Sequence, residues 1–142
     1  MSTLLLDTDV FSYLFKDHPL AEAYRPHVKG HTLAISFMTV AELFQGAFRA
    51  GWGSQQIERL ELWVASYVLV PSSNAMSKKW GEVRFIRRAQ PISPEDAWVA
   101  AAALQQGWPL VTHNARDFHG IPGLIIITES EGFRKRPSIP SR

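Results

Sequence analysis

The chain has 142 residues, of which 46% are hydrophobic, and this length and apolar content predict one compact domain. It has no cysteine, which excludes disulfide bonds, cysteine-ligated metal clusters and a cysteine nucleophile. No apolar run approaches the roughly 20 residues of a membrane helix, so we expect a soluble, unexported, cytoplasmic protein. The formal net charge of +2 gives only a slight indication of an anionic partner.

Short apolar runs alternate with segments of helical periodicity along the chain. The apolar runs predict strands at residues 4–6, 32–36, 67–70, 110–112 and 124–128. Helical spacing predicts helices at residues 10–15, 19–27, 37–50, 55–65, 73–89 and 95–106. Strands separated by helices indicate an α/β fold with a central, mostly parallel sheet flanked by helices. Residues 1–131 are expected to form this domain, and residues 132–142 a basic, flexible tail.

Four acidic residues lie at boundaries between an apolar run and another segment: Asp7, Glu42, Asp96 and Asp117. In a parallel sheet the strand ends and the following helix starts share one edge, where such proteins bind ligands. Carboxylates gathered there would repel and raise each other's pKa unless a cation compensates. Mg²⁺ takes oxygen ligands and commonly bridges to phosphates. The pattern therefore predicts metal-assisted phosphodiester chemistry, with the cation activating water and neutralising charge on the phosphate.

Each acid also has a purely structural interpretation. Thr39 with Glu42, Ser93 with Asp96, and Asn114 with Asp117 all fit an i to i+3 helix-capping pattern, and Asp7 or Asp9 could cap the first predicted helix. A helix N-terminus favours a negative charge whatever the protein does. The functional prediction therefore depends on all four acids meeting at one edge.

Basic residues gather away from the acids, at residues 78–88 and 134–136. Arg84, Arg87 and Arg88 are spaced i, i+3 and i+4, which would place them on one face of a helix. Such a face could contact a nucleic-acid backbone, and flanking cations would offset the repulsion between an acidic centre and phosphates. The alternative is an ordinary solvated helix face.

Several short stretches recur in a set order through nearly the whole chain: residues 4–10 (LLLDTDV), 36–43, 91–96, 100–104, 110–118 and 121–124. Their order and spacing resemble the PIN-domain ribonucleases, especially the VapC-type toxins of toxin–antitoxin systems. The resemblance implies a small α/β PIN fold, dependence on Mg²⁺ or Mn²⁺, and endonucleolytic hydrolysis of RNA. Transfer RNA is one candidate class of substrate.

On the matching positions, the resemblance implies that Asp7, Glu42, Asp96 and Asp117 form the catalytic acidic quartet. Metal ligands would come from Asp7, Asp96 and Asp117, while Glu42 or Asp117 could instead act through water or orient the attacking water. Site support would come from Thr8, Asp9, Thr112 and Asn114. RNA contacts are expected from Arg84, Arg87 and Arg88.

Two positions depart from the family pattern. Asp9 stands where this family very often has asparagine, so it adds a fifth acid that either binds a second ion or caps a helix. Ala89 and Gln90 stand where many relatives have a glycine before the Pro-Ile pair, so that turn is expected to differ slightly.

The resemblance also implies a homodimer and inhibition by a cognate antitoxin. Phe44, Phe48 and Trp52 lie at i, i+4 and i+8 and could form part of an interface, although such a stripe more often belongs to a core.

Two other functions compete with a nuclease. In a haloacid dehalogenase-like phosphatase, Asp7 would be the nucleophile, with Ser36 and Lys78 or Lys79 completing the motifs, but Phe11 replaces a small residue and no adjacent acidic pair follows. In a catalytically silent PIN-like module, the same surface would bind RNA or a protein partner without cleaving RNA.

Overall fold

The computed structural model describes residues 2–130. Within them the chain forms the strands β1 (Thr3–Leu6), β2 (Thr32–Ser36), β3 (Val68–Val70), β4 (Leu110–Val111) and β5 (Ile126–Ile127). The helices are α1 (Thr8–Lys16), α2 (Ala21–Val28), α3 (Phe37–Arg49), α4 (Ser54–Ala65), α5 (Asn74–Ile86), α6 (Pro94–Gln106) and the 3₁₀ helix η1 (Ala115–Phe118). The expected tail at residues 132–142 lies outside the described residues.

All strand pairs of the sheet are parallel, and the strand order is β3-β2-β1-β4-β5. In the central strand, Leu5 pairs with Ala34 of β2 on one side and with Leu110 of β4 on the other. The α/β fold and the parallel sheet predicted from the sequence are therefore confirmed. The carboxyl ends of β1, β2 and β4 lead directly into the segments that carry the predicted acids.

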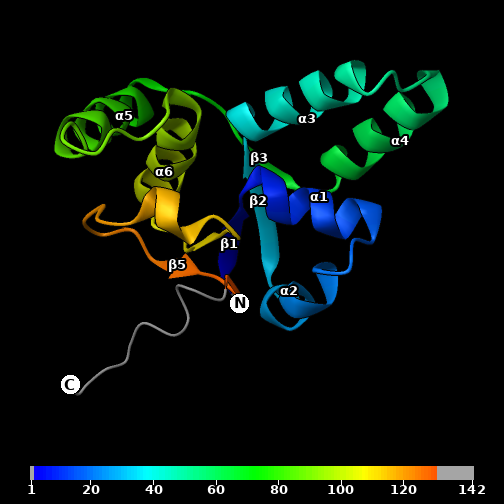
Figure 1. The fold of residues 1–142 in the computed structure, drawn as a ribbon, viewed down its shortest axis with the longest axis horizontal. Coiled ribbons are helices and arrows are strands. Elements are labelled where there is room, and N and C mark those ends of the chain that lie inside the picture. The colour runs from blue at the N-terminus through cyan, green and yellow to red at the C-terminus, as the bar shows by residue number, and fades with distance from the viewer. Residues whose placement is uncertain (1, 131–142) are drawn as a thin grey trace.

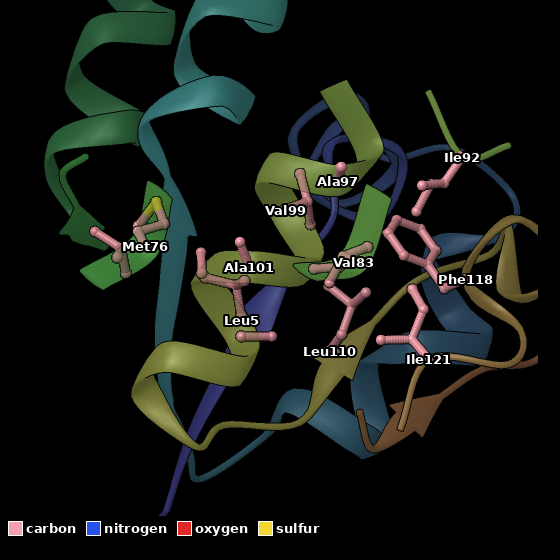
Figure 2. Packing of buried hydrophobic residues seen from close by; sticks show 14 of the residues in the cluster. Leu5, Met76, Val83, Ile92, Ala97, Val99, Ala101, Leu110, Phe118 and Ile121 are labelled. Atoms are coloured by element: carbon pink, nitrogen blue, oxygen red, sulfur yellow. The ribbon is translucent and has the colours of Figure 1, made fainter. Parts of the chain in front are cut away.

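Two apolar layers cover the two faces of the sheet (Figure 1). Leu5 points into a layer built with α5 and α6, whereas Leu4 and Leu6 point into a layer built with α1 to α4. This alternation follows from the two-residue period of a strand, and it explains why the β1 sequence is apolar throughout. The first layer, shown in Figure 2, lets α6 lie close to the sheet because its buried positions are mostly alanine.

Several helix boundaries differ from the expected ones. Helix α1 begins at Thr8 because the Asp7 side chain accepts a hydrogen bond from the Thr8 N–H. The capping pattern expected for Thr39 with Glu42 is wrong, since Ser36 caps α3 by accepting from the Thr39 N–H. Ser93 does cap α6, as the spacing predicted.

Helix α5 ends at Ile86, three residues before the expected end. Arg87 adopts φ −93° and ψ 22°, and the Arg88 N–H bonds to the Phe85 carbonyl, so the chain turns there. Helix α6 ends at Gly107, whose φ of 73° is a left-handed conformation that favours glycine. No helix in residues 2–130 has both the length and the apolarity that a membrane crossing requires.

Candidate active site

Asp7 lies between β1 and α1 and is almost completely buried, with 5% of its surface exposed. Its Oδ1 accepts a hydrogen bond of 2.8 Å from the Thr8 N–H, and its Oδ2 accepts one of 2.8 Å from the Thr112 hydroxyl. Thr112 follows β4, so this second bond joins the ends of two neighbouring strands. Asp7 therefore combines the capping role and the site position that the sequence presented as alternatives.

The pKa of Asp7 is raised from 3.8 to about 7, chiefly by burial and also by the charges of Asp9 and Glu42, against hydrogen bonds from Thr112 and Thr8 that lower it. Asp7 therefore takes up a proton near neutral pH. A nearby cation would favour its charged form.

Asp9 lies one residue inside α1 and is tied to the end of β4. Its Oδ1 accepts from the Val10 N–H at 2.6 Å, and its Oδ2 accepts from the His113 N–H at 3.1 Å. Its pKa is raised to about 6, chiefly by burial and also by the charge of Asp96, against the hydrogen bonds from Val10 and His113. The charge interaction with Asp96 places this fifth acid within electrostatic reach of the quartet.

Glu42 lies within α3, one turn beyond the cap at Ser36, and is half-buried. Its Oε1 accepts a hydrogen bond of 2.6 Å from the Thr8 hydroxyl, and the hydroxyl oxygens of Thr8 and Thr39 are 3.1 Å apart. Thr8 thereby serves two acids, with its backbone N–H bound to Asp7 and its hydroxyl bound to Glu42.

Asp96 lies in the first turn of α6 and is half-buried. Its backbone N–H donates to Ser93 Oγ at 3.0 Å, which fixes the start of the helix. Its pKa is raised to about 7, chiefly by burial and also by the charges of Asp7, Asp117 and Glu42, while a hydrogen bond with Ser93 lowers it. The other three predicted acids therefore lie within electrostatic reach of Asp96 at the carboxyl edge of the sheet.

Asp117 is the exposed member of the quartet and lies on η1. Asn114 stands at the start of η1 but makes no side-chain cap, and its carbonyl accepts from the Asp117 N–H at 2.9 Å. The Asn114 N–H donates to the Thr112 hydroxyl oxygen at 3.0 Å. The expected support by Thr112 thus reaches Asp7 directly, while Asn114 contributes through its backbone.

The three arginines predicted to contact RNA have different surroundings. Arg84 and Arg87 donate to backbone carbonyls of other segments, at Ile92, Gln90, Asp117 and His119. Arg88 is exposed, donates only to the Phe85 carbonyl among the hydrogen bonds described, and stacks 4.0 Å over the Phe85 ring.

Tyr24 is a supporting residue that the sequence did not reveal. It is fully buried on α2, and its hydroxyl is hydrogen-bonded to His113 Nδ1 at 2.6 Å and accepts from the Glu129 N–H at 3.0 Å. Because the His113 N–H binds Asp9, the contact between Tyr24 and His113 helps to fix Asp9 at the acidic edge. No local pattern could indicate this, because Tyr24 lies 89 residues from His113 in the chain.

The chemistry of the donor set fits a hard divalent cation, which takes carboxylate oxygens and retains waters. Within residues 2–130, no three acidic or histidine side chains already surround one point as metal ligands do. The charges of neighbouring acids contribute to the raised pKa values of Asp7 and Asp96. A cation would offset these charges and draw the carboxylates together.

Comparison with known proteins places this geometry in a family. The PIN domain model matches residues 4–124. Ribonuclease VapC1 of Haemophilus influenzae (strain R2866) is 34% identical over 125 residues, covering 84% of this chain and 92% of the relative. The tRNA(fMet)-specific endonuclease VapC of Shigella flexneri is 26% identical over 126 residues, covering 87% of this chain and 96% of the relative.

Among solved structures, VapBC-1 from nontypeable Haemophilus influenzae has a chain that superposes with a TM-score of 0.75 and 30% sequence identity. The match covers 90% of this chain and 98% of that chain. The family match spans β2, β3, β4, nearly all of β1 and every acid of the quartet. The chain therefore belongs to the PIN-domain family, and to its VapC-type members.

Proposed function

We propose that this chain is a divalent-metal-dependent endoribonuclease and the toxin of a toxin–antitoxin pair. The observation that carries the proposal is the convergence of Asp7, Glu42, Asp96 and Asp117, from four separate segments, at one edge of the sheet. Family membership leaves the phosphatase interpretation without support. Ser36 in particular is fully buried and caps α3, so it is not available to a phosphate.

The ligands of Mg²⁺, or of Mn²⁺ in its place, would be Asp7, Asp96 and Asp117. When bound, the cation supplies Lewis-acid chemistry, because it stabilises charge on the phosphate and promotes ionisation of water. Asp7 is oriented for this role, since two hydrogen bonds fix the plane of its carboxylate. The supporting groups are Thr8 and Thr112, which make these bonds. The Thr8 hydroxyl also binds Glu42.

Glu42 would orient the attacking water and accept its proton. Its Oε1 is held at 2.6 Å by the Thr8 hydroxyl, which leaves Oε2 to receive a proton from water. Asp9 would hold the end of β4 in place, because its Oδ2 accepts a hydrogen bond from the His113 N–H while its Oδ1 accepts one from the Val10 N–H.

RNA is the proposed substrate, with tRNA as the first class to test, because a VapC relative is named for a tRNA. Phosphates would meet the basic segment that begins on α5, where Arg88 is the exposed arginine and Arg84 and Arg87 could add only the donors that their carbonyl partners leave free. Arg88→Gln should reduce the salt dependence of RNA affinity. An unchanged salt dependence would show that Arg88 does not contact RNA.

The proposed protein partners are a cognate antitoxin and a second copy of the chain. VapC-type membership supports the first. For the second, the stripe expected at Phe44, Phe48 and Trp52 is only partly buried, and Phe48 is 68% exposed. Sedimentation of the purified chain would test the dimer, which a single monomeric species at micromolar concentration would contradict.

The decisive experiment is RNA cleavage with Mg²⁺, with and without a chelator, by the parent chain and by Asp96→Asn. We expect chelation and the substitution each to abolish cleavage, with Asp96→Asn retaining the parent's circular dichroism. Asp17→Asn is the matched control, because Asp17 is an exposed acid far from the edge and its left-handed φ of 52° suits asparagine. Undiminished cleavage by Asp96→Asn, or RNA binding with no cleavage by the parent, would overturn the proposal.

A further inference from the structure

Three arginines near the end of α5 carry the same charge but hold different parts of the molecule. Arg84 Nη1 donates to the Ile92 carbonyl at 2.7 Å. Arg87 donates from Nε to the Gln90 carbonyl at 2.8 Å, and from Nη1 to the carbonyls of Asp117 and His119, both at 2.9 Å. Arg88 donates to the Phe85 carbonyl, within its own turn. Of these three arginines, Arg84 and Arg87 connect the end of α5 to other segments of the acidic edge.

Arg84 anchors the segment that leads into Asp96. Ile92 is followed at once by Ser93, the cap of α6, and then by the first turn that carries Asp96. The Ile92 side chain is 3% exposed and belongs to the buried cluster that also contains Val83 of α5, as Figure 2 shows. The side chain and the carbonyl of Ile92 are therefore both attached to α5.

Arg87 anchors the segment that carries Asp117. One guanidinium nitrogen binds the Asp117 carbonyl itself and the His119 carbonyl two residues later. Between them Phe118 is 1% exposed and packs in the same cluster (Figure 2). The backbone on both sides of Phe118 is thus fixed to α5, while the Asp117 side chain remains exposed toward the site.

Residues 115–118 need such an anchor. They form a four-residue 3₁₀ helix without a side-chain cap, and short 3₁₀ segments have poorer hydrogen-bond geometry than an α-helix. Burial of Phe118 fixes the depth of the segment, but it does not by itself fix the rotation of the adjacent acid. Two hydrogen bonds from Arg87 Nη1 add that constraint, while Nε binds the Gln90 carbonyl and holds the plane of the guanidinium. A lysine ammonium lacks this planar fork.

We propose that Arg87, assisted by Arg84, is a positioning residue that sets Asp117 against Asp96 for the binding of a divalent cation. The inference rests on the proposed function. It gives Arg87 a structural role in the site in preference to a contact with RNA. Arg87 acts through the main chain of Asp117 and touches neither the substrate nor the reacting atoms.

The test is Arg87→Lys, which keeps the charge and removes the guanidinium fork, compared with Arg88→Lys at the same end of α5. The binding of Mn²⁺ alone is measured by calorimetry. Arg87→Lys should bind Mn²⁺ at least about 10-fold more weakly than the parent, the size of effect expected when a supporting contact of a metal ligand is lost. Arg88→Lys should bind Mn²⁺ as the parent does.

Kinetics separate positioning from RNA contact. Arg87→Lys should lower kcat while KM and the salt dependence of RNA binding stay at the parent values, since the charge is retained. Parental Mn²⁺ affinity and kcat in Arg87→Lys would overturn the proposal, as would equal losses of Mn²⁺ affinity in Arg87→Lys and Arg88→Lys.

Thermal unfolding checks that Arg87→Lys folds. If it does not, Arg84→Lys replaces it, with a smaller loss of Mn²⁺ affinity expected and parental affinity contradicting the proposal. A parent chain that binds Mn²⁺ but leaves RNA intact would overturn the proposed function alone. A parent chain that fails to bind Mn²⁺ would overturn this inference as well.

Discussion

The two ends of the acidic edge are built differently. At the β1–α1 junction Asp7 is 5% exposed, and both of its oxygens accept hydrogen bonds from within the fold. On η1 Asp117 is exposed, and its backbone is held by Arg87 from 30 residues away. The buried end has a fixed carboxylate that is costly to ionise, whereas the exposed end has a solvent-exposed carboxylate that needs an external anchor. Metal binding at such an edge would couple one rigid ligand to one adjustable ligand.

The largest expected effect separates these two ends. Asp7→Asn should reduce cleavage by about 100-fold or more, because it removes a proposed metal ligand. It should leave stability at pH 7.5 equal to or above that of the parent, because a neutral residue that still caps α1 replaces a buried charge. Cleavage assays and urea unfolding measure the two effects.

Asp117→Asn is the counterpart at the exposed end. It should reduce cleavage strongly yet change the free energy of unfolding by less than about 0.5 kcal/mol, as is usual for an exposed side chain. A large loss of stability in Asp7→Asn at pH 7.5 would contradict the roles assigned to the two acids. Parental cleavage by both Asp7→Asn and Asp117→Asn would contradict them as well.

The next effect concerns pH. The pKa values of Asp7 and Asp96 are raised from 3.8 to about 7, so between these values the folded chain binds more protons than the unfolded chain. The free energy of unfolding must then fall as pH rises through this range, with the stabilising contribution fully present below 3.8 and lost above about 7. In a chelating buffer the chain should be more stable at pH 5 than at pH 7.5.

Urea unfolding at the two pH values measures this difference. Asp7→Asn should show a smaller fall in stability between pH 5 and pH 7.5 than the parent, because one of the two acids with a pKa of about 7 is removed. A parent chain that becomes more stable between pH 5 and pH 7.5 would contradict the burial of ionisable acids at this edge.

A smaller effect is expected at the residue that serves two acids. Thr8→Val removes the hydroxyl that holds Glu42 but keeps the backbone N–H that binds Asp7. Cleavage should fall by about 10-fold, since one hydrogen bond to a charged group contributes about 1.5–3 kcal/mol and part of that orientation survives. Thr8→Ser, which keeps the hydroxyl, should cleave like the parent, and a loss in Thr8→Ser as large as in Thr8→Val would show that the methyl group matters instead.

The Asp7 end of the acidic edge could be predicted from the sequence more fully than the Asp117 end. The strand-then-acid pattern at Asp7, and the Ser93–Pro94 start of α6, are local signals that predicted both the fold and the positions of Asp7 and Asp96. Glu42 lies in the helix that the sequence predicts at residues 37–50, but the sequence pattern favours Thr39 as the cap because Ser36 also ends a strand.

The contacts that locate Asp117 could not be predicted from the sequence. Arg84, Arg87 and Arg88 share one spacing pattern, yet only Arg87 bonds to Asp117 and His119, which depends on where the chain returns after α6. Tyr24 was missed for the same reason, since it meets His113 only through the packing of α2 beside the end of β4. Local patterns reveal strand ends and helix caps, whereas side-chain contacts to distant carbonyls require the folded structure.

The central claim is that the acids at the carboxyl edge form a divalent metal site, and calorimetric titration of Mn²⁺ into the parent chain tests it most directly. Because Asp7 and Asp96 have pKa values of about 7, binding at pH 6.5 should release protons. The heat should accordingly change with the ionisation enthalpy of the buffer, and the affinity should weaken as pH falls from 7.5 to 5.5. Absent binding, or binding that is independent of pH and undiminished in Asp96→Asn, would contradict the claim.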